Sequence, residues 1–181
     1  MRKLKVVLAS ALLAFSLNAN ARPVAENNIA DVAAANGNFG VLLLAVSLYP
    51  DIERTLTRKG QYTVFAPTDA AFGNLAAVLP ALCFNDGLVA YVLDNPGYIK
   101  DVLLYHVAKG SRDAAEVLPA DQVRTLNGEF ITREPFSLEL DNPFGVGEAT
   151  TIVLPNVFAS NGVVHAIDQV LLPSPPPSYC L

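Results

Sequence analysis

Two histidines and two cysteines are the side chains of this 181-residue chain best suited to chemistry: His106, His165, Cys83 and Cys180. Imidazole can bind a metal or relay a proton near neutral pH, and thiolates bind soft metals or form disulfides. A structural zinc site or an iron–sulfur cluster needs about four such ligands. The sequence also lacks the His-Glu-x-x-His and Gly-x-Ser-x-Gly patterns of zinc proteases and serine hydrolases. These residue types therefore predict no catalytic residue, no metal site and no cofactor.

The surroundings of the two histidines favour a structural role. His106 lies between Leu104 and Val107, and His165 between Val164 and Ile167. A neutral imidazole in an apolar context usually forms hydrogen bonds with the backbone. We therefore expect both histidines to stabilise the fold.

Thr68 and Asp69 follow a strand-like segment and precede a helix that begins near Ala70. Either side chain can accept a hydrogen bond from the free N–H groups of a helix start, and a carboxylate also favours that end of the helix dipole. General acid–base catalysis by Asp69 would need a cleft and a partner group. We expect Thr68 and Asp69 to be capping residues.

The composition describes one apolar globular domain, with 52% hydrophobic and 16% charged residues. The formal charge is 12 − 17 = −5. The densest local excess of basic residues is Arg2, Lys3 and Lys5 at the start. No stretch of the sequence forms a basic patch that could bind phosphates, so nucleic acid is not an expected partner.

Residues 1–21 have the pattern of a secretory signal peptide. A basic start is followed by an apolar run at 6–17 and by Ala19-Asn20-Ala21, which predicts cleavage before Arg22. The run is too short for a membrane-spanning helix of roughly 20 residues, and we expect no transmembrane segment. Cleavage would leave 181 − 21 = 160 residues, starting with a linker at 22–27, and a charge of 9 − 17 = −8. The predicted location is extracellular, or the periplasm or cell surface of a bacterium.

Export would expose Cys83 and Cys180 to an oxidising environment. An even cysteine count in a secreted chain makes one disulfide between them the simplest prediction. It would tie down the proline-rich tail at 174–181. The alternative is a free Cys180 that pairs with a second molecule.

The apolar pattern predicts helices in the first two thirds of the chain. A helix at 28–36 starts at Asn28 and stops at Gly37, and an all-round apolar, buried helix at 39–48 ends before Pro50. A strand at 62–66 leads into the helix near Ala70. Two more helices are expected at 85–94 and 96–105, the second with a buried stripe of Ile99, Val102 and Leu103.

Strand patterns dominate the remainder. Segments 123–126 and 129–132 flank Asn127-Gly128, a two-residue hairpin turn. A second hairpin joins 151–154 or 157–159 to 163–170 across Asn161-Gly162, with a loop at 141–147 between the hairpins. Helices followed by hairpins predict an α+β domain with an antiparallel sheet.

Three sequence blocks carry a family resemblance: YTVFAPTDAAF at 62–72, LYHV at 104–107 and NGVVHAIDQVLLP at 161–173. In this order and spacing they resemble the first conserved box, the Tyr-His motif and the second conserved box of the fasciclin domain. The resemblance covers 28–173. It implies a wedge or sandwich of antiparallel strands flanked by short helices, in extracellular proteins that mostly serve adhesion or matrix organisation.

The resemblance also suggests partner-binding residues. In animal matrix members, an Asp-aliphatic pair and the Tyr-His motif after it are linked to integrin recognition, which here corresponds to Asp101, Val102, Tyr105 and His106. Val102 replaces the usual Ile, and no Arg-Gly-Asp triplet occurs. Val102 also belongs to the stripe predicted to be buried, and a buried side chain cannot touch a receptor without local opening.

Two functions are compatible with these observations. The first is adhesion or matrix interaction with an extracellular or cell-surface protein or a matrix polysaccharide. Because only one copy of the blocks is present, adhesion would need weak self-association or display by a partner. The second is a soluble extracellular carrier of an apolar small molecule such as a carotenoid, which some algal members bind. Its pocket would use dispersed aromatic rings: Phe39, Phe65, Phe72, Tyr91, Tyr98 and Phe144.

Overall fold

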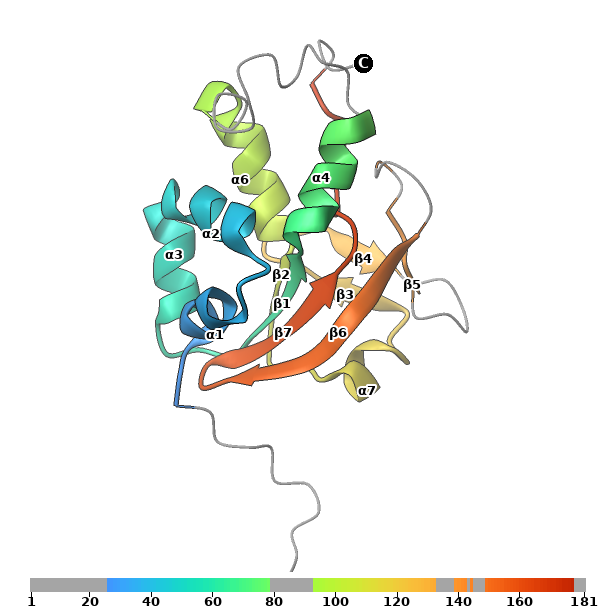
Figure 1. Cartoon of the computed structure of the whole chain (residues 1–181). Coiled ribbons are helices and arrows are strands. Elements are labelled where there is room, and N and C mark those ends of the chain that lie inside the picture. Colours follow the sequence, from blue (N-terminus) through green and yellow to red (C-terminus); the bar gives the residue numbers. More distant parts are fainter. Residues whose placement is uncertain (1–25, 79–92, 133–138, 143, 145–148, 178–181) are drawn as a thin grey trace, which may run out of the picture.

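A computed structural model describes residues 26–78, 93–132, 139–142, 144 and 149–177 (Figure 1). The helices of these residues are short: α1 (Ile29–Asn36), α2 (Gly40–Ser47), α3 (Pro50–Thr57), α4 (Asp69–Val78), α6 (Pro96–Tyr105) and α7 (Ala114–Val117). The strands are β1 (Tyr62–Pro67), β2 (Val107–Lys109), β3 (Gln122–Arg124), β4 (Phe130–Thr132), β5 (Glu139–Leu140), β6 (Thr150–Ala159) and β7 (Gly162–Ile167).

Five strands form a sheet in the order β2-β1-β7-β6-β5, and β3 pairs with β4 in a separate hairpin. The α+β class is confirmed, but the prediction of an antiparallel sheet is wrong in one respect. β1 runs parallel to β7, with Tyr62 opposite Gly162 and Pro67 opposite Ile167. The other strand pairs are antiparallel. A parallel pair needs a long connection, and here most of the chain lies between the two partners.

The predicted helix signals mark real boundaries. Asn28 caps α1 through a capping box, and Gly37 ends the helix with a left-handed φ of 76°. Pro50 does follow α2, but it also begins the unpredicted helix α3 as its first residue, a position where proline loses no hydrogen bond. The prediction that α2 is buried all round is wrong, because Leu44 is exposed, as is Leu48 at the C-cap.

Both predicted hairpins are present, each with a difference. β3 and β4 are shorter than expected, and β6 contains both alternative partners of β7 in one strand with two register shifts. Asn156 lies at the second shift with φ of 61°, a backbone conformation that asparagine tolerates better than most residues. The predicted helix at 85–94 falls almost wholly outside the described residues. The signal peptide, Tyr91 and the Cys83–Cys180 disulfide lie outside them entirely.

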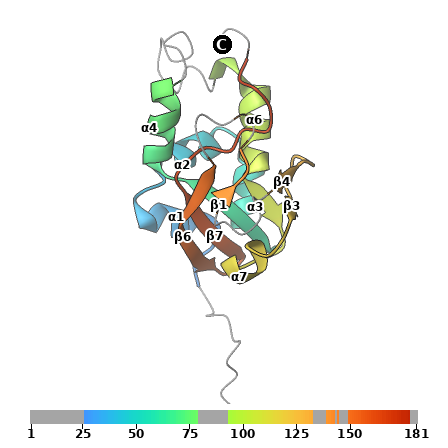
Figure 2. The ribbon, with the colours of Figure 1, turned by 90° about the vertical axis from the view of Figure 1, so that its right-hand side faces the viewer.

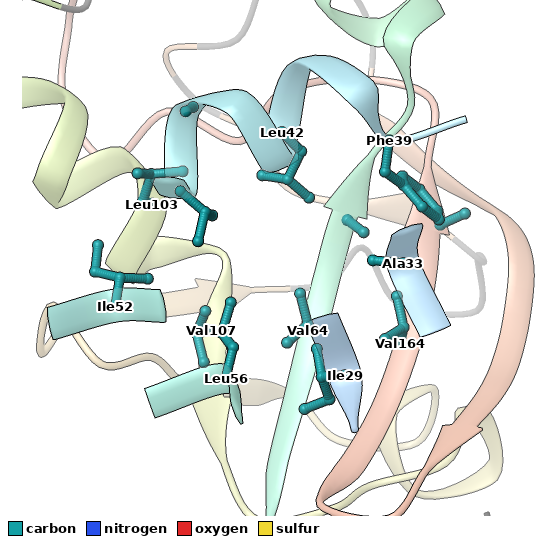
Figure 3. Packing of buried hydrophobic residues seen from close by; sticks show 14 of the residues in the cluster. Ile29, Ala33, Phe39, Leu42, Ile52, Leu56, Val64, Leu103, Val107 and Val164 are labelled. Carbon is teal, nitrogen blue, oxygen red and sulfur yellow. The ribbon is translucent and has the colours of Figure 1, made fainter. Parts of the chain in front are cut away.

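The sheet has a different apolar cluster on each face because strand side chains alternate. Val64, Val107 and Val164 pack against helices α1, α2, α3 and α6 in the first cluster (Figure 3). On the opposite face, Phe65 and Ile167 pack with residues that include Val117 of α7 and Val123 and Ile131 of the small hairpin. The sheet is therefore covered on both faces.

Helices α4 and α6 lie beyond the end of β1 and β7, as the two views together show (Figures 1 and 2). Val170 and Leu172 pack between Ala71 of α4 and Val102 of α6. The start of the C-terminal tail also contacts the domain, because the Tyr98 hydroxyl donates to the carbonyl of Ser174 over 3.1 Å. The chain after β7 thus joins the two helices.

Candidate functional site

His106 is buried at the C-terminal end of α6, with 2% of its surface exposed. Its Nδ1 lies 2.7 Å from the carbonyl oxygen of Val102, and its Nε2 lies 3.0 Å from the backbone nitrogen of Leu171. A carbonyl only accepts and an N–H only donates, so the ring is neutral with its proton on Nδ1. Burial lowers the pKa of His106 to about 4. The imidazole joins α6 to the chain after β7.

Of the four residues suggested for partner binding, Asp101 alone is exposed. Val102, Tyr105 and His106 are all buried. Tyr105 donates its hydroxyl to the carbonyl oxygen of Phe130 over 3.1 Å, and desolvation raises its pKa to about 12. In this conformation a partner can reach Asp101 but not the Tyr-His pair.

Thr68 and Asp69 cap two different helices. The Thr68 hydroxyl accepts from the backbone N–H of Ala71 over 3.2 Å in the first turn of α4. The Asp69 carboxylate instead accepts from the N–H groups of Gly40 and Val41 at the start of α2, over 3.2 and 2.8 Å. Because α2 has no cap from its own preceding residue, this distant carboxylate supplies it. The local sequence pattern predicted capping but could not identify the second helix.

His165 occupies the centre of β7 and is fully buried. Its Nδ1 accepts from the N–H of Asn156 over 3.2 Å, and its Nε2 donates to the carbonyl of Arg112 over 3.0 Å. The ring therefore carries its proton on Nε2, the opposite tautomer to His106. Burial is the main cause that lowers the pKa of His165. Asn156 in turn accepts from the N–H of Ala114 over 2.7 Å, which links β7, the irregular part of β6 and α7.

Asn161 is a structural residue that the sequence analysis placed only in a turn. Its side chain accepts from the N–H of Ile29 over 2.8 Å and donates to the carbonyls of Leu56 and Arg58 over 2.7 and 2.9 Å. It therefore ties the start of α1 and the end of α3 to the β6–β7 turn. The next residue, Gly162, has φ of 155°, and a Cβ there would lie 2.0 Å from the carbonyl oxygen of Tyr62. No other residue fits this position.

An open depression lies beside Asn161, at the same end of the sheet. Its volume is about 400 Å³, and its lining residues come from the end of α3, the loop before β1 and the β6–β7 turn: Thr57, Arg58, Lys59, Gly60, Gln61, Ser160 and Asn161. A second, very small hollow of about 10 Å³ lies between α4 and the segment after β7. The larger depression is edged by cationic and polar side chains.

The aromatic residues considered for a carrier pocket are dispersed. Phe39 and Phe65 are buried in the two separate clusters. Phe72 and Tyr98 pack against the clusters from their edges, while Phe144 is 40% exposed. The described rings do not converge on one cavity.

The described residues also limit other site types. Within them, no three His, Cys, Asp or Glu side chains come together in a way that could hold a metal ion. Among the same residues, no helix combines the length and the apolar character needed to cross a bilayer. The side chains of His106, His165, Tyr105 and Asp69 are instead engaged with backbone groups.

The chain is similar to known proteins over most of its length. A family model described as the fasciclin domain matches residues 37–173. The chain is 40% identical over 147 residues to protein sll1483 of Synechocystis, covering 80% of this chain and 73% of that protein. It is 32% identical over 158 residues to the immunogenic protein MPB70 of Mycobacterium bovis, covering 86% and 74%. The chain belongs to the fasciclin domain family.

A solved structure supports the same fold. The structure of a domain pair from the insect cell adhesion molecule fasciclin I superposes with a TM-score of 0.67 at 14% identity, covering 87% of this chain and 54% of that chain. This chain thus spans about half the length of that pair. At this identity the likeness concerns the fold.

Proposed function

We propose that this protein is a secreted, non-enzymatic fasciclin-domain module for adhesion or for interaction at a cell surface or extracellular matrix. The observation that carries the proposal is the family match over 37–173, together with the fold shared with a cell adhesion molecule. The signal-like residues 1–21 support export. The partner is an extracellular or cell-surface protein or a matrix polysaccharide.

The geometry of the motif residues supports binding over catalysis. A general acid or base must reach a substrate proton, whereas His106 and His165 are buried and hydrogen-bonded to backbone groups. Asp69 is likewise engaged with the start of α2. We therefore assign these residues to the framework and the partner contact to the surface.

The test measures whether the protein attaches to a surface and whether it carries a bound ligand. Beads coated with the protein purified from its own host should bind the host's outer surface or matrix, and uncoated beads should not. Native mass spectrometry and an ultraviolet–visible spectrum of the same sample should reveal a ligand-free monomer or weak oligomer. A stoichiometric apolar ligand, with no attachment, would contradict adhesion and establish the carrier function.

A further inference from the structure

The fold gathers basic side chains that are dispersed in the sequence. Among the described residues, four lysines and arginines lie at the end of the sheet where β1 and β7 begin: Arg58, Lys59, Lys109 and Arg112. They come from two segments about fifty residues apart. Because the two segments are separated in the sequence, neither stands out there as a basic patch.

Strand pairing fixes this arrangement. Lys109 lies opposite Tyr62 in the β1–β2 ladder, and the N–H of Gly110 donates to the carbonyl of Gln61 over 2.7 Å. Gln61 itself lines the depression beside Arg58 and Lys59. Lys109 and Gly110 therefore lie at the same end of the sheet as the depression, next to Gln61, but they are not among the residues that line it.

Arg112 joins the group from the next turn. Its backbone N–H donates to the Thr63 hydroxyl over 2.9 Å. Its side-chain Nε lies 3.9 Å from the point where a Cβ on Gly110 would be. The Arg112 side chain thus folds back over Gly110, toward the strand end that carries Lys109.

These four cations differ from other basic residues that the structure describes. Lys100 pairs with Asp51 at 2.7 Å, and Arg124 lies over the Phe130 ring at 6.0 Å. Within the described part of the chain, none of these four cations forms an ion pair, and two of them, Arg58 and Lys59, line the depression. Their charge is available to an external anion.

Acidic residues are also present at this end. Glu26 is exposed, one residue before Asn27, whose carbonyl accepts from the N–H of Ser160 over 2.8 Å. Asp113 and Glu116 follow Arg112, and their carboxylates accept from backbone N–H groups in the capping box of α7. Among the residues that the structure describes, the depression itself is lined by Arg58 and Lys59 and by no acidic residue.

The depression has the chemistry of a saccharide site. Gln61 and Ser160 supply amide and hydroxyl groups, which can donate to and accept from sugar hydroxyls. The Thr57 hydroxyl donates to the carbonyl of Glu53 over 2.9 Å, so it can only accept from a ligand. Asn161, which lines the depression, is fixed by three hydrogen bonds. The backbone around it would therefore need little ordering when a ligand binds. Cations at the edge would pair with carboxylate or sulfate groups on the same polymer.

We propose that this cationic depression binds an anionic polysaccharide, a proposal that rests on the proposed function and names its partner class. A polymer chain can follow an open depression while the rest of this acidic protein stays in solvent. A charged bilayer would instead bring a wide anionic plane against a molecule whose formal charge is −5, which is repulsive.

The test uses the full secreted protein and defined polymers. Affinity electrophoresis in gels that contain polygalacturonate or dextran sulfate should retard the protein, and neutral dextran should not. Charge reversal with Arg58→Glu and Lys59→Glu should weaken retardation by about tenfold or more, and added salt should weaken it in the wild type. Stronger retardation by one of the two polymers would identify carboxylate or sulfate as the preferred group.

A matched control reverses Lys100 and Arg124, which changes the net charge by the same amount away from the depression. It should leave retardation within about twofold, because long-range charge effects are screened in salt. Absence of wild-type retardation, or equal loss in both double variants, would overturn the proposal. Stronger binding to vesicles with anionic lipid, lost in the same variant, would replace it with a membrane site.

Attachment of coated beads separates this inference from the proposed function. If the Arg58→Glu, Lys59→Glu variant keeps surface attachment, and wild-type protein is not retarded by either polymer, adhesion stands and the polysaccharide site is wrong. If wild-type protein is retarded but no beads attach, the site exists and the adhesive function fails.

Discussion

The two ends of strand β1 differ in how far their polar groups are engaged. At its C-terminal end, His106 and Asp69 are hydrogen-bonded to backbone groups. At its N-terminal end, Asn161 is equally engaged, but Arg58 and Lys59 edge an open depression. Among the described residues, the motif residues of the first end are engaged with backbone groups, whereas the second end carries exposed cations beside an open depression.

This contrast indicates that the residues that identify the family differ from those that are available to bind a partner. The residues that identify the family are those that position helices and strands, so their substitution should lower the free energy of unfolding. Side chains that make no internal contact can change without that cost. We therefore expect stability and binding to respond to different substitutions, and the following predictions are arranged from the largest effect on stability to the smallest.

Gly162→Ala should give the largest loss of stability. The new Cβ would meet the Tyr62 carbonyl oxygen at 2.0 Å, which forces β1 and β7 apart. We expect destabilisation of about 3 kcal/mol or more, measured by urea unfolding. Gly128→Ala, at a positive φ but with no atom within 4 Å, is the control and should cost less. Equal losses of stability in the two variants would show that the close approach of residue 162 to the Tyr62 carbonyl is unimportant.

Acid should have the next largest effect on stability, because both histidines are buried and neutral in the folded protein. The pKa of His106 is about 4 in the fold against 6.5 for the free side chain, so between these values the unfolded chain binds the extra proton. This contribution to stability is complete above pH 6.5 and is lost as the pH falls toward 4. From pH 7 to 5 it should amount to about 2 kcal/mol.

His165 acts in the same direction, since burial also lowers its pKa. His106→Gln should lower stability at pH 7 and flatten its decline toward pH 5, as urea unfolding at the two pH values would measure. An unchanged slope in this variant would mean that His106 does not carry the acid sensitivity.

Removal of the Asp69 carboxylate should have a smaller effect. Asp69→Ala leaves the N–H groups of Gly40 and Val41 without their cap, which should cost about 1 kcal/mol. Hydrogen exchange should show the loss at the start of α2 rather than in α4, whose cap is Thr68. Faster exchange in α4 with α2 unaffected would contradict the assignment.

Tyr105→Phe should cost about 1 kcal/mol, because it removes a single hydrogen bond to the carbonyl of Phe130 and keeps the ring. Retardation by anionic polymer should be unchanged at temperatures where the variant is folded. A loss of retardation without a loss of stability would place the Tyr-His motif at the binding surface and remove the contrast between the two ends.

Arg58→Glu combined with Lys59→Glu should change stability least, within about 0.5 kcal/mol, because both side chains are exposed. The melting temperature and the urea midpoint measure this. A large loss of stability would mean that the two cations support the fold, and the loss of polymer binding could then not be assigned to the depression.

Local patterns predicted what depends on neighbouring residues. Asn28 and Gly37 mark the ends of α1, and Asn127-Gly128 lies between β3 and β4, since caps and tight turns are set within a few residues. The buried stripe of α6 was also predicted, because its spacing is helical. The three motif blocks identified the family because their order is specific.

Long-range contacts were not predictable in the same way. The parallel pairing of Tyr62 with Gly162, and the capping of α2 by Asp69, join segments that are far apart in the sequence. Lys109 is placed at the same end of the sheet by another long-range pairing, in which it lies opposite Tyr62. These contacts form the end of the sheet beside the depression. Because they were not predictable, the candidate binding residues differ from those suggested by the resemblance.

The most direct test of the structural role of the two histidines is their titration in the folded protein by NMR. We predict that His106 stays neutral with its proton on Nδ1 down to about pH 4, and that His165 carries the opposite tautomer with a pKa below 6.5. Titration of His106 near 6.5 would mean that solvent reaches the motif. The Tyr-His pair would then be open to a partner, contrary to the structural role assigned here.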